Sequence, residues 1–278
     1  MAVSLLALAL GTAIPVAAQT PRGIILATTT SMQDTGLLDS LVPRFEHRCR
    51  CRVKTIAVGT GQALALGARG EADVVLVHAP TLELEYVREG TFVDRRLVMT
   101  NDFVLVGPKA DPAGIRQART VVNALRRIAS GPHPFASRAD SSGTNILELG
   151  LWKRAGVAPR GPWYFEVGQG MGATLRLASQ KQAYALTDRG TFLSQRHGLD
   201  LAILHEGDAA LLNVYHVMRP NPDVFSNLNV EGGRAFADFM VEPATQAFIA
   251  QFGVARFGQP LFRPAAGRRE EDLLRKAS

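Results

Sequence analysis

The sequence predicts an α/β fold of two lobes around a ligand cleft. Short β-branched runs alternate with helical stretches from Gly23 onward, which is typical of βα units and a parallel sheet. Hydroxyl- or glycine-rich turns recur where strands end and helices begin. Two longer extended runs, residues 97–106 and 211–218, separate segments in which short strands and helices alternate. We interpret them as two passages between lobes.

The elements are expected in the following order. The first lobe begins with strands at 23–27, 53–58 and 74–77, and with helices at 35–47, at 61–69 and from Pro80 onward. The second lobe has helices at 121–130, 144–155 and 173–182, and strands at 135–137, 163–167 and 183–186. Helices at 231–240 and 243–252 return to the first lobe. We expect lobe 1 over residues 23–103 and 205–262, lobe 2 over 104–204, and a polar, loosely held tail over 263–278.

Residues 1–18 are predicted to be a signal peptide. An apolar run ends in small residues, with Val16 and Ala18 at the cleavage-site positions, which leaves Gln19 as the first mature residue. The run is too short to span a bilayer, although no Lys or Arg precedes it. We therefore expect an extracytoplasmic, periplasmic protein without a membrane span.

Composition narrows the class of function. The 31 Lys and Arg residues exceed the 25 Asp and Glu residues, a net charge of +6 that favours anionic ligands or an acidic partner. The basic residues are not interleaved with aromatic ones, so no nucleic-acid partner is expected. Cys49 and Cys51 are too few for a metal site, and a disulfide between residues two apart would be strained. The histidines form no metal-binding or catalytic pattern: His47, His78, His133, His197, His205 and His216.

Three turns carry the chemistry. They span residues 28–31 (Thr-Thr-Thr-Ser), 59–61 (Gly-Thr-Gly) and 138–144 (Arg-Ala-Asp-Ser-Ser-Gly-Thr). The N–H groups and dipole of a helix N-terminus attract an anion, and adjacent hydroxyls add donors. Each turn alone is more simply explained as a helix cap. Three such turns with one Arg favour a shared anion site at the carboxyl ends of the strands.

These motifs also support a family resemblance. The R-x-D-x-S-G-T segment at 138–144 resembles that of phosphate-binding and related oxyanion-binding proteins. Together with the first two turns, the Gly-x-Gly-Met-Gly segment at 168–172 and the segment at 184–191, it resembles the tungstate-binding components of ABC importers over residues 23–262. The resemblance implies a type II periplasmic-binding-protein-like fold, with a two-strand hinge and a ligand cleft between the lobes.

The resemblance also implies a ligand set. The matching contacts are Thr29, Thr30, Ser31, Thr60, Arg138, Ser142, Gly143 and Thr144, with further contacts from Gly170, Met171 and Gly172. Asp140 is expected to orient Arg138 or to cap the helix. Two positions depart from the family pattern: Ala139 stands where Gly or Ser is common, and Asn145 where His is frequent. The implied protein is a monomer and not an enzyme. It has no cofactor or free metal cation, and it delivers its oxyanion to a permease in the inner membrane.

Several alternatives remain open. Tungstate and molybdate are nearly the same size, so the sequence does not separate them. A phosphate- or sulfate-binding protein of the same fold is the second reading. A different class is suggested by Gly168, Gly170 and Ala173, which match the G-x-G-x-x-A of an NAD-dependent oxidoreductase, with Asp188 at about the spacing of a ribose-binding acid. The export signal and the late position of this motif weigh against that reading.

Overall fold

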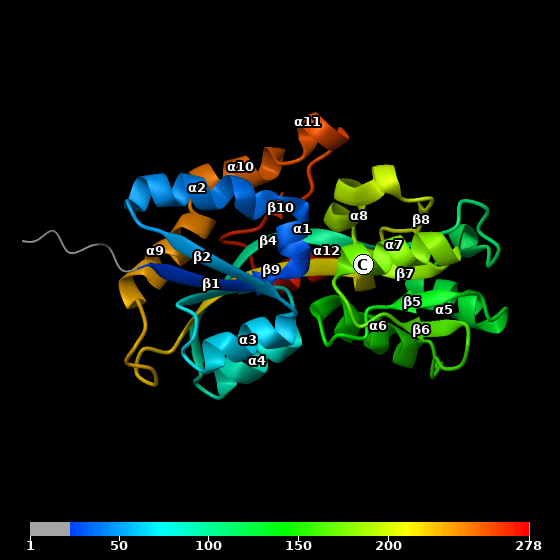
Figure 1. Cartoon of the computed structure of the whole chain (residues 1–278), viewed down its shortest axis with the longest axis horizontal. Coiled ribbons are helices and arrows are strands. Elements are labelled where there is room, and N and C mark those ends of the chain that lie inside the picture. Colours follow the sequence, from blue (N-terminus) through cyan, green and yellow to red (C-terminus); the bar gives the residue numbers. More distant parts are fainter. Residues whose placement is uncertain (1–22, 278) are drawn as a thin grey trace, which may run out of the picture.

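The computed structural model describes residues 23–277, so the predicted signal peptide at 1–18 lies outside the described part. Two α/β lobes lie side by side, and strand β4 (Phe92–Gly107) runs from one into the other (Figure 1). The predicted two-lobed α/β class is confirmed. Within residues 23–277, no helix is both long and apolar enough to cross a membrane.

Lobe 1 is built on a mixed sheet in the order β2-β1-β3-β9-β4. The other strands of this sheet are β1 (Ile24–Thr29), β2 (Val53–Val58), β3 (Val74–Val77) and β9 (Leu212–Pro220). β1 is parallel to β2 and β3, whereas β9 is antiparallel to both β3 and β4. The parallel strands therefore end at one edge, and the turns that follow β1 and β2 lie there together.

Lobe 2 continues the sheet from the second half of β4. The order is β4-β7-β5-β6, and β8 also pairs with β4. These strands are β5 (Phe135–Ser137), β6 (Tyr164–Glu166), β7 (Tyr184–Asp188) and β8 (Ala202–His205). The partner of β4 changes between adjacent residues, because Asp102 pairs with Leu212 of β9 and Phe103 pairs with Asp188 of β7. β4 and β9 are the strands that connect the lobes.

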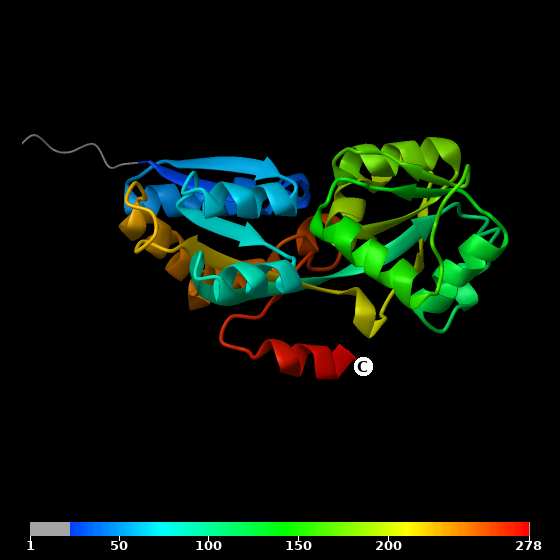
Figure 2. The same cartoon turned by 90° about the horizontal axis from the view of Figure 1, so that it is seen from below.

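Helices cover both faces of each half of the sheet (Figures 1 and 2). In lobe 1 they are α1 (Thr30–Thr35), α2 (Leu37–Cys49), α9 (Val230–Val241) and α10 (Pro243–Gln251) on one face, and α3 (Thr60–Ala68) and α4 (Pro80–Arg88) on the other. In lobe 2 they are α7 (Met171–Lys181) and α8 (Arg189–Gln195) on one face, and α5 (Val121–Ser130) and α6 (Gly143–Arg154) on the other. Successive side chains of β1 point to opposite faces of the sheet. Buried Leu26 therefore packs in the core on the α2 side, and buried Ala27 packs in the core on the α3 side.

The helices and strands expected from the sequence form within a few residues of their predicted bounds. Short elements were missed, including α8, β8, α11 (Val254–Phe257) and the single turns η1 (Ile115–Gln117), η2 (Arg196–Gly198) and η3 (Ala209–Leu211). Their periodic patterns span too few residues to be recognised.

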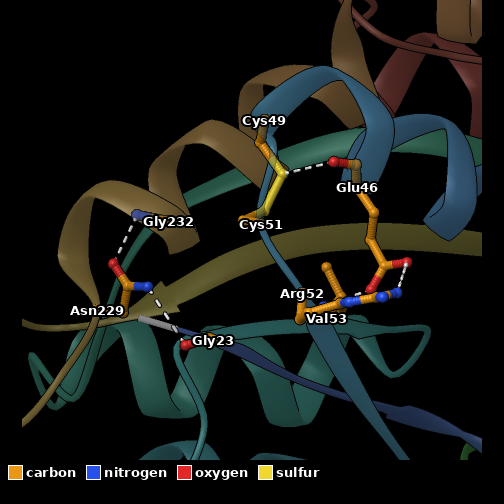
Figure 3. The surroundings of a disulfide bond; sticks show 8 residues. All are labelled: Gly23, Glu46, Cys49, Cys51, Arg52, Val53, Asn229 and Gly232. Atoms are coloured by element: carbon orange, nitrogen blue, oxygen red, sulfur yellow. Dashed lines mark hydrogen bonds and ion pairs between the residues drawn. A yellow bond between two sulfur atoms is a disulfide. The ribbon is translucent and has the colours of Figure 1, made fainter. Parts of the chain in front are cut away.

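Cys49 and Cys51 form a disulfide, although a bond between residues two apart was expected to be strained (Figure 3). Arg50 ends α2 in the left-handed conformation (φ 54°, ψ 36°), which turns the chain so that the two Cα atoms lie 5.2 Å apart. Glu46 of α2 reaches past the disulfide and accepts a hydrogen bond from the N–H of Val53 (2.8 Å). The disulfide thus closes the connection from α2 to β2.

The C-terminal segment is also more ordered than its polar sequence suggested. β10 (Arg263–Pro264) pairs with β4, and Ala265 is buried. Helix α12 (Glu270–Ala277) runs beneath lobe 1 toward lobe 2 (Figure 2). The Glu270 carboxylate lies 3.2 Å from Arg95 and 3.3 Å from His216 on the connecting strands. The segment is held more firmly than expected, because Glu270 pairs with Arg95 and His216 and β10 pairs with β4.

Candidate functional site

The turn after β1 presents hydroxyls and the N-terminus of α1. Thr29 caps the helix by accepting a hydrogen bond from the N–H of Met32 (3.3 Å), and its Oγ1 lies 3.0 Å from Ser31 Oγ. Thr29 and Ser31 are buried, whereas Thr30 is half-buried. The predicted helix cap is therefore confirmed for this turn, and its role as a ligand contact stays a prediction.

The turn after β2 reaches the other lobe. Thr60 is fully buried, and its Oγ1 accepts a hydrogen bond from the N–H of Gly143 (3.0 Å). A Cβ on Gly59 would lie 3.5 Å from the carbonyl oxygen of Asp140, and one on Gly61 would lie 3.6 Å from that of Ser141. The two turns therefore lie against each other within van der Waals distance.

The third turn, residues 138–144, winds tightly before α6. Ala139 (φ 48°) and Ser141 (φ 56°) are left-handed, which explains why Gly is common at position 139. Ser142 caps α6 by accepting from the N–H of Asn145 (3.3 Å), and Asp140 Oδ1 accepts from the N–H of Ser142 (3.2 Å). This winding gathers the first N–H groups of α6 beside Arg138.

Arg138 is the cation of the cluster and is only 2% exposed. Its Nη2 donates to the Asp140 carboxylate and, across the lobes, to Thr30 Oγ1 (3.4 Å). Asp140 thus both orients Arg138 and supports the turn. Arg138 Nε and Thr144 Oγ1 are buried without a hydrogen-bond partner among the described residues. Leaving buried donors unpaired costs about 1–3 kcal/mol each, so this arrangement favours an acceptor ligand.

Glu148 of α6 lies directly behind the Arg138 turn, and sequence reasoning missed it. Its carboxylate accepts from Ser137 Oγ (2.9 Å), Trp152 Nε1 (3.2 Å) and Tyr164 OH (2.8 Å). Burial raises the pKa of Glu148 to about 7, and these donors partly offset that rise. The buried face of α6 also carries the polar residues Thr144 and Asn145, so no apolar pattern in the sequence marks Glu148 as an exception.

The glycine segment at 168–172 lies at the same place. A Cβ on Gly170 would lie 3.7 Å from Thr30 Oγ1, and Met171 is fully buried at the start of α7. Asp34 of α1 lies near the backbone N–H of Gly172. Burial raises the pKa of the Asp34 carboxyl, while the nearby Arg138 charge and this N–H group lower it in part. The structure therefore brings all three predicted turns and the glycine segment together.

Asp188 has a structural role that differs from ribose binding. Its Oδ1 accepts a hydrogen bond from the N–H of Thr191 (2.8 Å) and so caps α8. The side chain is fully buried, and burial raises its pKa to about 6. Among the described residues, no group of three or more His, Cys, Asp or Glu side chains could hold a metal ion.

Donors from two lobes thus meet at the strand ends of a hinged α/β protein, which defines a binding protein of the periplasmic type. A family model described as a PBP superfamily domain matches residues 15–244. The tungstate-binding protein TupA of Peptoclostridium acidaminophilum is 45% identical over 252 residues, 90% of this chain and 88% of that protein. The chain belongs to this family of tungstate-binding proteins within the PBP superfamily.

Two solved structures agree with this assignment. The tungstate ABC transporter structure from Geobacter sulfurreducens has 46% identity and a TM-score of 0.76, covering 83% of this chain and 98% of that one. The tungstate-binding protein TupA from Desulfovibrio alaskensis G20 has 40% identity and a TM-score of 0.72, covering 88% and 99%. These names describe transport and binding proteins, so the oxidoreductase alternative has no support from the relatives.

Proposed function

We propose that this protein is the solute-binding component of an ABC importer and that it captures tungstate between its lobes. The observation that carries the proposal is Arg138, a buried cation that pairs with Asp140 and lies among hydroxyl and N–H groups from both lobes. A dianion held by dipoles alone would lose most of its hydration without a matching charge, and Arg138 supplies one. The 45% identity to a tungstate-binding protein supports the choice of ligand.

The ligand contacts follow from the same cluster. The proposed contacts are the turns at 29–31 and 142–144, Thr60 and Arg138. The N–H groups of Ser142 and Gly143 already donate to Asp140 and Thr60. The proposed donors are therefore the Thr60 and Thr144 hydroxyls, the Arg138 guanidinium and the other N–H groups of the two turns. The buried unpaired atoms Arg138 Nε and Thr144 Oγ1 support this set. Gly170, Met171 and Gly172 complete it from α7, because Gly170 lies against Thr30.

Selection against phosphate rests on hydrogen-bond direction. Near neutral pH, phosphate carries a proton that needs an acceptor, whereas tungstate and molybdate carry none. Asp140 is the nearest acidic neighbour of Arg138, and both of its oxygens already accept bonds within the turn. We therefore rank tungstate and molybdate above phosphate, the second candidate. Calorimetry with tungstate, molybdate, sulfate and phosphate tests the ranking, and preferential heat with phosphate would reverse it.

Delivery requires export and docking. We propose that the mature, monomeric protein acts outside the cytoplasm and passes its oxyanion to a membrane permease in the lobe-closed form. The apolar run that ends at Ala18 supports export. N-terminal sequencing should find Gln19 as the first residue of protein recovered outside the cytoplasm. An intact Met1 in a cytoplasmic fraction would reject the export proposal.

A further inference from the structure

We propose that His78 is a positioning residue of the oxyanion site, which fixes the Ser31 hydroxyl and links it to the strands that connect the lobes. This inference rests on the proposed function, because it concerns the same site. His78 follows β3 and is 4% exposed. It is not among the contacts that the family resemblance implies.

The first link joins His78 to the turn after β1. Its Nε2 lies 3.2 Å from Ser31 Oγ, and Ser31 Oγ lies 3.0 Å from Thr29 Oγ1. Thr29 Oγ1 in turn accepts from the N–H of Met32. Four polar groups thus form one continuous chain that begins at the N-terminus of α1.

The second link joins His78 to β9 and β4. The imidazole Nδ1 lies 3.0 Å from Asn213 Oδ1. Asn213 Nδ2 donates to Asn101 Oδ1 (2.8 Å) and to Tyr215 OH (3.0 Å). Asn101 and Asn213 are directly paired residues of β4 and β9, one residue before β4 changes its partner from β9 to β7. His78 therefore contacts the point at which the lobes are joined.

The direction of each hydrogen bond follows from these partners. Asn213 turns its amide nitrogen toward Asn101, so its oxygen faces His78 and must accept from Nδ1–H. Nε2 is then the acceptor, and the Ser31 hydroxyl donates to it. Burial, and then the charge of Arg138, lower the pKa of His78 to about 4, so the ring stays neutral at pH 7. The Ser31 hydroxyl therefore points toward His78. The backbone N–H groups of the turn at 29–31 are left to bind an anion.

The third contact comes from lobe 2. A Cβ on Gly143 would lie 3.0 Å from the His78 carbonyl oxygen and 3.1 Å from the ring atoms Cε1 and Nδ1. The imidazole also packs on Tyr215, with ring centroids 4.7 Å apart. His78 thus touches the first turn, the third turn and a connecting strand at once. A change in its position would alter donors on both lobes.

Three substitutions separate the two links. An Asn amide can replace Nδ1 and a Gln amide can reach the position of Nε2, whereas Phe keeps the ring and removes both nitrogens. We expect H78F to weaken tungstate binding about tenfold, which corresponds to about 1.4 kcal/mol. H78Q should stay within about threefold of the parent, and H78N should fall between the two. Melting temperatures measured in parallel identify variants that fail to fold.

A double-mutant cycle tests whether His78 acts through Ser31. In a Ser31→Ala background, H78F should cost less than threefold in tungstate affinity, because the link is already broken. An H78F protein that is folded and binds like the parent would overturn the proposal, and so would a full tenfold loss in the Ser31→Ala background.

A ligand-free measurement separates this inference from the proposed function. Nitrogen-15 NMR of the parent at pH 7 should show a neutral His78 ring with the proton on Nδ1. A proton on Nε2, or on both nitrogens, would overturn the inference whatever the protein binds. A parent protein that binds none of the four oxyanions but shows the Nδ1–H ring would reject the proposed function alone.

Discussion

Thr60 of lobe 1 accepts a hydrogen bond from the backbone N–H of Gly143 of lobe 2 at 3.0 Å, and both residues are buried. The same glycine packs against His78 so closely that a Cβ would meet its carbonyl oxygen at 3.0 Å. A side chain at position 143 would therefore require His78 to shift by a few tenths of an ångström in this arrangement of the lobes. Helix α6 can hold an alanine there, since helical backbone suits either residue, but the opposite lobe cannot accept it without moving.

Gly143→Ala should weaken tungstate binding by about tenfold, because the methyl group must push the His78 backbone away and so oppose closure. Gly150→Ala on the same helix is the matched control, since its Cβ would meet no atom within 4 Å. The control should keep the parent affinity and gain up to about 1 kcal/mol of stability. Calorimetry and thermal melts of both proteins decide the matter, and equal affinities would argue against a tight contact at Gly143.

Arg138→Ala should weaken tungstate binding by about one to two orders of magnitude, because a hydrogen bond to a charged group contributes roughly 1.5–3 kcal/mol. Arg138→Lys should recover only part of the loss, since an ammonium does not reproduce the planar guanidinium. Titration calorimetry of the three proteins gives the comparison. An Arg138→Ala affinity within about threefold of the parent would remove this residue from the site.

The buried carboxyl of Glu148 should make stability depend on pH. Its pKa rises from 4.5 to about 7 on folding, so the folded chain binds more protons than the unfolded chain between these values. The free energy of unfolding should therefore fall as pH rises from about 4.5 to 7, by up to the order of 3 kcal/mol from this group. His78 acts in the opposite direction, because its pKa falls from 6.5 to about 4.

Glu148→Gln isolates this contribution. The decrease between pH 5 and pH 8, measured by urea unfolding, should be smaller in the variant than in the parent, while His78 contributes equally to both. Glu85→Gln, which alters an exposed residue of α4, should leave the parent profile unchanged. Parallel profiles for the parent and Glu148→Gln would show that Glu148 does not titrate in this range.

The Cys49–Cys51 disulfide should contribute little to stability. It closes a loop of three residues, and the chain-entropy relation gives roughly 1.6 kcal/mol for so short a loop. Replacing both cysteines with serine should therefore cost about 1–2 kcal/mol in urea unfolding. Adding a reductant should produce the same loss in the parent and none in the double variant. A loss several times larger would mean that the disulfide also holds α2 against β2.

Local patterns predicted the fold class and the three turns because each signal lies within a few neighbouring residues. A β-branched run followed by Thr-Thr-Ser or Gly-Thr-Gly specifies a strand end and a helix start without distant information. Arg138 was predicted for the same reason, since its partner Asp140, which also accepts from the N–H of Ser142, belongs to the same motif.

The residues behind the site could not be predicted in this way. His78 stands alone after β3, and its partner Asn213 is 135 residues further along the chain. Glu148 has the spacing of an ordinary helical residue, and its role appears only when Ser137 and Tyr164 are folded against it. The disulfide depends on the left-handed backbone of Arg50, which Arg seldom adopts. Tertiary contacts decide the roles of His78 and Glu148, and the local backbone conformation of Arg50 decides the disulfide.

The position of β9 between β3 and β4 also bears on how the protein is assembled. The second lobe is one uninterrupted stretch of chain, from the second half of β4 to η3, so it can collapse on contacts that are mostly near in sequence. The first lobe lacks an inner strand until residues 212–220 are present, and its edge pairing with β10 comes later still. Pairing strands that are so far apart in sequence costs more chain entropy, so lobe 1 should form more slowly. We therefore expect lobe 2 to fold first. Lobe 1 is then completed beside it.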